Sequence, residues 1–227
     1  MQLFYSKSIL TSPTLDKNES FHCISVLRNK INDIIHVTDG KGNLYDCKIL
    51  RIVDKNIKLE ILRTKNTSLN KKVKLAISFP KNRNRIEWML EKITEIGVCE
   101  IYPIICTNSE RNKINIDRCE KILTSAMKQS LNLFKPILNK ITSFNEFVKS
   151  IKCEEKYIAH CNNNYNRELI KMSKKNEICI MIGPEGDFSK EEIKFSEEKN
   201  FKSVKLSENR LRTETAAIVA CNNFISL

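Results

Sequence analysis

The sequence has only five glycines among 227 residues, and their spacing matches no common nucleotide-binding loop. A dinucleotide-binding loop requires Gly-x-Gly-x-x-Gly after a strand, and a P-loop requires Gly-Lys followed by Ser or Thr. Neither pattern occurs in the chain. These absences exclude a typical dehydrogenase loop and a typical NTPase loop.

Long apolar runs and paired metal ligands are also missing. The apolar runs fall far short of the ~20 residues that span a bilayer, and the N-terminus lacks the pattern of a secretory signal. The nine cysteines form no Cys-x-x-Cys pair, which argues against a disulfide framework and a zinc ribbon. We therefore expect a cytoplasmic protein with no metal site and no membrane contact, whose cysteines are mostly reduced core residues.

Positive charge is abundant: the formal net charge is +12 at pH 7. A basic protein of this size usually binds a polyanion. Part of the lysine content is typical of an AT-rich genome, so the arginines are the clearer signal, because a guanidinium offers a planar fork that lysine lacks. Those near expected turns or helix starts are Arg28, Arg83, Arg85, Arg111, Arg210 and Arg212.

The first seventy residues indicate a small β-rich domain. Two β-prone runs flank Asp39-Gly40-Lys41-Gly42, which predicts a hairpin. Residues 57–64 favour another strand, and residues 18–30 favour a short helix that ends near Arg28. The polar residues 65–72 favour a linker. We expect one domain at residues 1–70 and a second at residues 71–227.

From Val73 onward, strands and helices alternate, which predicts a mainly parallel sheet. A helix with apolar residues at 86, 89, 90, 93 and 96 should end at Gly97. Capping boxes at Ser143 with Glu146 and at Ser189 with Glu192 should begin two further helices. Expected strands are residues 73–79, 99–106, 136–141, 156–160, 177–182 and 203–207.

Two segments near the C-terminus carry the strongest functional signal. Gly183-Pro184-Glu185-Gly186 lies between a buried strand and a helix, where open α/β sheets bind ligands. Glycine there lets backbone N–H groups approach a ligand closely, although a plain tight turn would also need it. The last helix should begin with Thr213 as N-cap. It is apolar on almost all sides, which indicates burial on several sides.

Several segments, in order, resemble the RsmE family, the uridine-N3 methyltransferases of small-subunit ribosomal RNA in the SPOUT superfamily. The resemblance covers nearly the whole chain, including "HCISVLR", "EKITEIGVCEIYPIICTNSER", "SAMKQS", "IGPEGDFSKEE" and "LRTETA". It implies a PUA-like β-barrel domain that binds RNA, followed by a trefoil-knotted α/β methyltransferase domain. It also implies a homodimer, S-adenosylmethionine as cofactor, and 16S ribosomal RNA or the 30S subunit as substrate.

The resemblance places the cofactor against three strand ends and the last helix. Two residues depart from the family pattern: Asp187 stands where a second glycine is usual, and Asn132 where arginine is frequent. The expected cofactor residues are His160, Ile182, Gly183, Pro184, Glu185, Gly186, Leu206, Ser207, Leu211, Thr213 and Ala217.

Methylation at uracil N3 removes a weakly acidic proton and leaves negative charge on the flanking carbonyl oxygens, which a fixed guanidinium would stabilise. Arg212 is the first catalytic candidate and Arg111 the second, although Arg212 is also explained by a structural contact at the helix start. Glu185 and Glu214 are candidate bases or partners of the sulfonium. Glu214 is equally explained by the helix dipole.

RNA contacts are expected from both domains. His22 is also explained as a packed helix residue, and Trp88 and Tyr102 are expected in the core rather than against a base. The candidate RNA-binding residues are His22, Arg28, Arg83, Arg85, Arg111, Lys128, Gln129 and Ser130.

Two alternatives to this function remain open from the sequence. The first alternative is an RNA-binding ribosome-assembly factor of the same fold with weakened or lost catalysis. It stays open because Asp187 and Asn132 depart from the family pattern. A methyltransferase of the same superfamily that acts on another RNA position is the second alternative.

Overall fold

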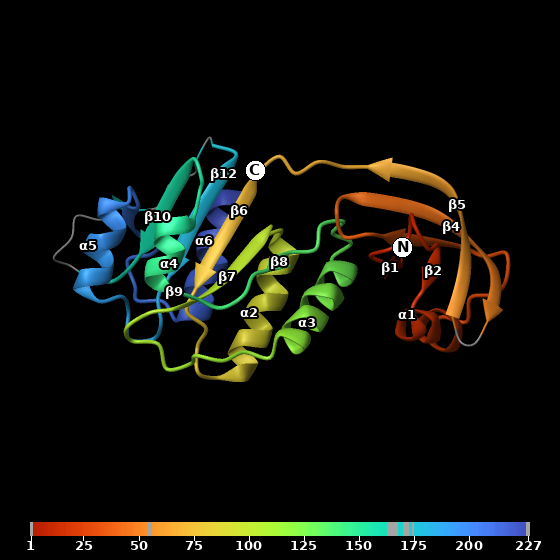
Figure 1. Ribbon diagram of the computed structural model, residues 1–227, viewed down its shortest axis with the longest axis horizontal. Coiled ribbons are helices and arrows are strands. Elements are labelled where there is room, and N and C mark those ends of the chain that lie inside the picture. The colour runs from red at the N-terminus through yellow and green to blue at the C-terminus, as the bar shows by residue number, and fades with distance from the viewer. Residues whose placement is uncertain (1, 54–55, 163–167, 170–172, 174, 226–227) are drawn as a thin grey trace. The chain divides into compact units, whose positions relative to one another are not determined.

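The computed structural model describes residues 2–53, 56–162, 168–169, 173 and 175–225. The chain forms two compact units (Figure 1). Unit 1 comprises Met1–Leu69 and Thr124–Lys135, and unit 2 comprises Asn70–Leu123 and Pro136–Leu227. Among the described helices, none is long and apolar enough to cross a membrane.

Unit 1 is built on a sheet with strand order β1-β3-β4-β5-β2. Its core contains Phe4, Tyr45 and Ile57, all almost fully buried. The strands are β1 (Leu3–Tyr5), β2 (Thr14–Leu15), β3 (Ile34–Thr38), β4 (Asn43–Val53) and β5 (Asn56–Asn66), and the helical segments are α1 (Lys17–Phe21) and the π-helical η1 (His22–Val26).

Local predictions for unit 1 are confirmed at its turns. Strands β3 and β4 pair antiparallel across the expected hairpin, where Gly40 and Gly42 have φ of 74° and 93°. A Cβ on Gly42 would lie 2.4 Å from the ring of Phe134, so only glycine fits there. The first helical segment ends before Arg28, whose φ of 60° is left-handed and stops the helix.

Unit 2 contains the larger sheet, with order β11-β13-β10-β12-β6-β7-β8, and its pairs are parallel as predicted. Strand β9 also pairs with β7. The strands are β6 (Lys72–Ile77), β7 (Glu100–Ile105), β8 (Ile137–Leu138), β9 (Thr142–Ser143), β10 (Glu155–Ala159), β11 (Glu168–Leu169), β12 (Glu177–Ile182) and β13 (Lys202–Lys205).

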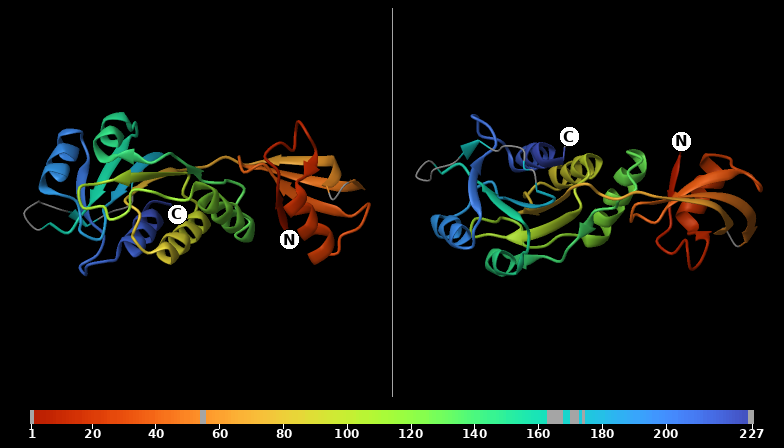
Figure 2. Two further views of the ribbon diagram at one scale, coloured as in Figure 1. Left: turned by 60° about the horizontal axis from the view of Figure 1, so that its bottom comes forward. Right: turned by 90° about the horizontal axis from the view of Figure 1, so that it is seen from above.

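Helices cover both faces of this sheet (Figure 2). On β12, Ile178, Ile180 and Ile182 face one apolar cluster, and Cys179 and Met181 face the other. The first cluster includes residues of α2 (Arg83–Ile96), of the first part of α3 (Ile116–Gln129) and of α6 (Thr213–Ile225). The second includes residues of α4 (Phe144–Ser150) and α5 (Lys190–Glu198).

The expected helix boundaries of unit 2 are mostly confirmed. Gly97 ends α2 in the left-handed region with φ of 105°. Both capping boxes are present at the N-termini of α4 and α5. The expected linker at residues 65–72 is wrong at its ends, because β5 continues to Asn66 and β6 begins at Lys72.

Candidate functional site

A cavity of about 320 Å³ lies at the carboxyl ends of β10, β12 and β13, beside the start of α6. This is where an open parallel sheet binds ligands. The loops that follow these three strands supply most of its wall. The expected cofactor residues that line it are His160, Ile182, Gly183, Pro184, Glu185, Leu206, Ser207, Leu211 and Thr213.

Gly186 and Ala217, which were also expected to bind the cofactor, are not among the residues that line this cavity. Ala217 is fully buried in the core. Gly186 faces Asn108 instead, whose Cβ would lie 3.1 Å from an added Cβ on the glycine. Gly186 must therefore be small because it packs against Asn108 of a neighbouring loop, and not because of a ligand in the cavity.

Three carboxylates line the cavity, those of Glu185, Asp187 and Glu214, and two of them have one buried oxygen without a hydrogen bond to a described residue. Glu185 Oε1 accepts from the backbone N–H of Lys81 at 3.0 Å, which leaves Oε2 unsatisfied. Glu214 is 6% exposed, its Oε1 lies 3.5 Å from Nε of Arg85, and its Oε2 is unsatisfied. Buried polar atoms are rarely left unpaired. Both oxygens are suited to a cationic or hydrogen-bond-donating ligand.

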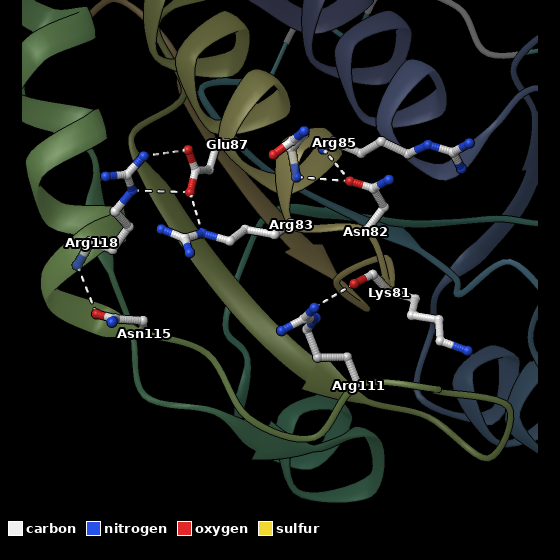
Figure 3. Close-up of polar contacts among 9 residues, drawn as sticks. Lys81, Asn82, Arg83, Arg85, Glu87, Arg111, Asn115 and Arg118 are labelled. Carbon is white, nitrogen blue, oxygen red and sulfur yellow. Dashed lines mark hydrogen bonds and ion pairs between the residues drawn. The ribbon is translucent and has the colours of Figure 1, made fainter.

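Arg111 braces the loop after β6 and does not line the cavity. Its Nε donates to the carbonyl of Pro80 at 3.2 Å, and its Nη2 donates to the carbonyl of Lys81 (Figure 3). Arg111, the second catalytic candidate from the sequence, therefore hydrogen-bonds to backbone carbonyls and lies outside the cavity wall.

Arg212 is exposed and lines the cavity, and its side chain makes no hydrogen bond or ion pair with a described residue. Its carbonyl accepts from the N–H of Ala216 at 2.8 Å, so Arg212 and not Thr213 occupies the capping position of α6. Thr213 is the first residue of the helix, and its hydroxyl donates to the carbonyl of Gly183 at 3.3 Å. That bond ties α6 to the loop at residues 183–186, which we call the glycine loop.

Arginine also gathers at the N-terminal ends of α2 and α3 (Figure 3). Glu87 Oε1 accepts from Nε of Arg83 at 2.7 Å and from Nε of Arg118 at 3.0 Å, and its Oε2 accepts from Nη2 of Arg118 at 2.8 Å. We call Arg83, Glu87 and Arg118 the arginine triad. Sequence reasoning missed Arg118, because its partner is 31 residues away on another helix and no local pattern marks the pair.

The triad leaves guanidinium surface available to a ligand. The side chains of Arg83 and Arg118 are 64% and 51% exposed. The two arginines lower the pKa of the Glu87 carboxyl to about 2, chiefly through their hydrogen bonds. Glu87 is therefore ionised at neutral pH and holds both guanidinium groups in fixed orientations.

The other expected RNA residues belong to unit 1 and differ in availability. Arg28 and Gln129 are exposed. Half-buried His22 packs near the ring of Phe4, with centroids 6.1 Å apart. Lys128 forms an ion pair with Glu19, and the hydroxyl of Ser130 donates to Ala126 O at 2.8 Å. Lys128 and Ser130 are thus engaged within unit 1.

Two further expectations from the sequence have mixed outcomes. Trp88 was expected in the core, but it is 46% exposed because it lies on the outer side of α2. Tyr102 is half-buried and packs on Phe147, with centroids 5.1 Å apart, as expected for a core residue. Asn132, where the family often has arginine, accepts the N–H of Phe134 at 2.9 Å and stabilises a turn.

Comparison with known proteins gives consistent matches. Residues 67–225 match a family of RNA methyltransferase domains, and residues 15–62 match a family of RNA methyltransferase PUA domains. The chain is 31% identical to ribosomal RNA small subunit methyltransferase E 2 of Borreliella burgdorferi over 214 residues, which cover 91% of this chain and 87% of that protein. The expected α/β fold with a PUA-like N-terminal unit is confirmed.

Solved structures agree with these matches. A structure described as a probable rRNA-methyltransferase from Porphyromonas gingivalis is 34% identical with a TM-score of 0.90, covering 97% of this chain and 95% of that chain. Ribosomal RNA small subunit methyltransferase E of Neisseria gonorrhoeae, solved with bound S-adenosyl methionine, is 28% identical with a TM-score of 0.80 and the same coverage.

The arginine triad predicts a specific pH dependence. Because the pKa of Glu87 is lowered from its usual 4.5 to about 2 in the folded chain, its stabilising contribution is present above pH 4.5 and is lost as pH falls toward 2. NMR titration of the side-chain carboxyl should show this low pKa. Arg118→Ala should raise it, and Arg51→Ala, a change in unit 1, should not. An unchanged pKa of Glu87 in Arg118→Ala would contradict the triad.

Proposed function

The chain belongs to the ribosomal RNA small subunit methyltransferase E family, and on that premise we propose that it methylates a uridine at ring N3 in 16S ribosomal RNA with S-adenosylmethionine as donor. One observation carries the proposal most directly. A cavity at the carboxyl ends of β10, β12 and β13 presents two buried carboxylate oxygens that lack a partner among the described residues. A cationic cofactor would supply what they lack.

The residues of the cavity fit S-adenosylmethionine. When bound, this cofactor supplies an activated methyl group on a sulfonium. Glu185 and Glu214 offer negative charge for its cationic groups, and the backbone of residues 182–185 and 206–211 offers hydrogen-bonding groups at the loop ends. The N. gonorrhoeae relative, with 28% identity over nearly the whole chain, was solved with this cofactor.

The acceptor base needs two things from the protein: a group that takes the N3 proton and a cation for the charge left on the ring. Glu185 and Glu214 are the carboxylates of the cavity wall with an unsatisfied oxygen and are our candidates for the first role. Arg212 is our candidate for the second, because it is exposed at the cavity and no described residue neutralises it. A cation that meets negative charge as it develops is a common source of rate enhancement, and substrate binding would have to order this exposed side chain.

The alternative of an assembly factor without catalysis gains no support from the two departures. Asp187 has φ of 64°, the conformation that glycine would adopt, and its carboxylate contacts backbone N–H groups. Asn132 stabilises a turn in unit 1. Neither substitution removes a carboxylate or a cation from the cavity wall.

RNA binding in this proposal uses unit 1, which matches a PUA domain, and the arginine triad of unit 2. Arg118 and Arg83 present fixed guanidinium groups, which suit phosphate oxygens. Arg85 lines the cavity and lies on the same helix as Arg83. We propose the assembled 30S subunit as the preferred form of the substrate and the cytoplasm as the location.

We also propose that the chain acts as a homodimer and that its C-terminal segment follows the trefoil-knotted path of the SPOUT superfamily. Ile218 and Val219 are only half-buried on α6, although the helix carries apolar residues on nearly every side. A second copy would cover them. Light scattering at micromolar concentration should give twice the mass of one chain. A fully active monomer would exclude the dimer.

The direct test of the function is mass mapping of modified nucleosides after incubation with S-adenosylmethionine. Naked 16S RNA and assembled 30S subunits, both lacking the modification, would be compared. We expect one 3-methyluridine in 16S RNA, formed faster in the 30S subunit. Cofactor binding without methylation of either substrate would favour the assembly factor. Methylation at another RNA position would favour the second alternative, a methyltransferase of the same superfamily with a different target.

The arginine triad predicts a change in salt dependence. Each phosphate neutralised contributes ~0.7–0.9 to the slope of log affinity against log salt concentration. Arg118→Ala should therefore reduce the slope by about one such unit in equilibrium RNA-binding measurements. The matched control is Lys194→Ala, which removes an exposed cation from α5 on the other face of the sheet. Equal slopes for Arg118→Ala and wild type would exclude a phosphate contact.

The catalytic role of Arg212 predicts a large kinetic effect. Arg212→Lys keeps the charge but loses the planar fork, so turnover should fall ~100-fold or more, as when one oxyanion-stabilising donor is removed. Affinity for S-adenosylmethionine should change little. A merely structural arginine would instead lower the melting temperature and leave the folded enzyme near its normal rate. Single-turnover kinetics on the folded variant separates these outcomes.

A further inference from the structure

Asp187 has a backbone conformation that few residues other than glycine adopt. Its φ is 64°, in the left-handed region, where a non-glycine residue is uncommon. Asp and Asn tolerate this region better than other residues, because their short polar side chains hydrogen-bond locally. Aspartate at this position therefore destabilises the folded chain compared with glycine, unless its side chain makes a stabilising contact.

The carboxylate of Asp187 joins two of the loops that form the cavity. Its Oδ2 accepts from the backbone N–H of Cys161 at 2.7 Å, and its Oδ1 accepts from the N–H of Phe188 at 2.8 Å. Cys161 follows β10 and Asp187 follows β12, two neighbouring parallel strands. Both residues line the cavity.

The backbone of Asp187 extends this connection to further loop positions. Its N–H donates to the carbonyl of Pro184 at 2.9 Å, which closes the turn of the glycine loop. Its carbonyl accepts from Nδ2 of Asn108 at 3.0 Å, on the loop after β7. One residue thus connects the loops after β7, β10 and β12. Among these bonds between loops, only the one to Cys161 uses the side chain, so glycine could not make it; glycine would also lack the local bond to Phe188.

We propose that Asp187 is a positioning residue for the cofactor: it fixes Cys161, just after the end of β10, against the glycine loop, so that the cavity has its binding shape before the cofactor arrives. This inference rests on the proposed function, because S-adenosylmethionine is taken as the ligand. A site that is already ordered loses less conformational entropy on binding. The carboxylate acts through the Cys161 loop and does not contact the reacting atoms.

Glycine and asparagine substitutions separate the hydrogen bond from the backbone strain. Asp187→Gly removes the bond to Cys161 but suits φ of 64°, so the fold should keep its stability. Asp187→Asn keeps a side-chain oxygen that can accept from the same N–H. The control Asn200→Gly relieves the same kind of strain, at φ of 65°, at the end of α5 away from the cavity wall.

Calorimetric titration with S-adenosylmethionine, together with melting temperatures of the free proteins, provides the test. We expect Asp187→Gly to raise the Kd ~10-fold, which corresponds to ~1.4 kcal/mol, and Asp187→Asn to stay within ~3-fold of wild type. Asn200→Gly should bind as wild type does. Native-state exchange of the Cys161 amide hydrogen should be faster in Asp187→Gly than in wild type, and this readout needs no ligand.

Each outcome bears on a distinct statement. A wild-type protein that does not bind S-adenosylmethionine would contradict the proposed function. Wild-type binding with an unchanged Kd in Asp187→Gly would overturn the positioning role. Equal weakening in Asp187→Gly and Asp187→Asn would also overturn it, since the hydrogen bond and not the charge is held responsible. If Asp187→Gly melts much lower than wild type, two other results decide. Near wild-type affinity in Asp187→Asn together with slow exchange of the Cys161 amide in wild type would support the positioning role. Fast exchange of that amide in wild type would overturn it.

Discussion

The burial of β12 on both faces is the constraint on which the rest of unit 2 depends. Its side chains alternate between two apolar clusters, and β10 and β6 pair with it on either side. A strand enclosed in this way cannot shift by one residue without exchanging its two faces. The end of β12 at Ile182 is therefore fixed, and with it the start of the loop at residues 183–187. Core packing thus determines where the cavity lies, independently of any polar contact.

Polar contacts then determine the shape of the loops around that fixed point. Glu185 accepts from the backbone of Lys81, Asn108 donates to the carbonyls of Gly186 and Asp187, and Arg111 holds the carbonyls after β6. These bonds hold the loops after β6 and β7 against the loop after β12, which forms part of the cavity wall. Burying a polar atom without a hydrogen bond costs free energy, and this cost falls on Glu185 and Glu214, each with a buried oxygen that no described residue satisfies. Such a cost is typical of a binding site, where a ligand compensates for it.

The sequence predicted most features that depend on local chemistry. Apolar runs, the two capping boxes and Gly97 located strands and helix ends within a few residues, because these signals act over one or two turns. Features that depend on side chains meeting across the fold were missed. Arg118 binds Glu87 on another helix, Gly186 faces Asn108 rather than the cavity, and Trp88 lies on the exposed side of α2. Family resemblance located the cavity wall but could not assign a contact to Asp187, where this chain departs from the family.

The distribution of partners among the arginines explains why Arg212 is singled out. Of the three arginines that line the cavity, Arg85 lies beside Glu214 and Arg210 donates to the carbonyl of Glu185. A guanidinium that already faces a carboxylate gains less from new negative charge than a free one, because much of its field is compensated. Arg212 has no such compensation from a described residue, and its exposure spares it the cost of burying an unpaired charge. Its charge is thus available at the cavity wall, at the capping position of α6, where the N–H groups of the helix add positive potential.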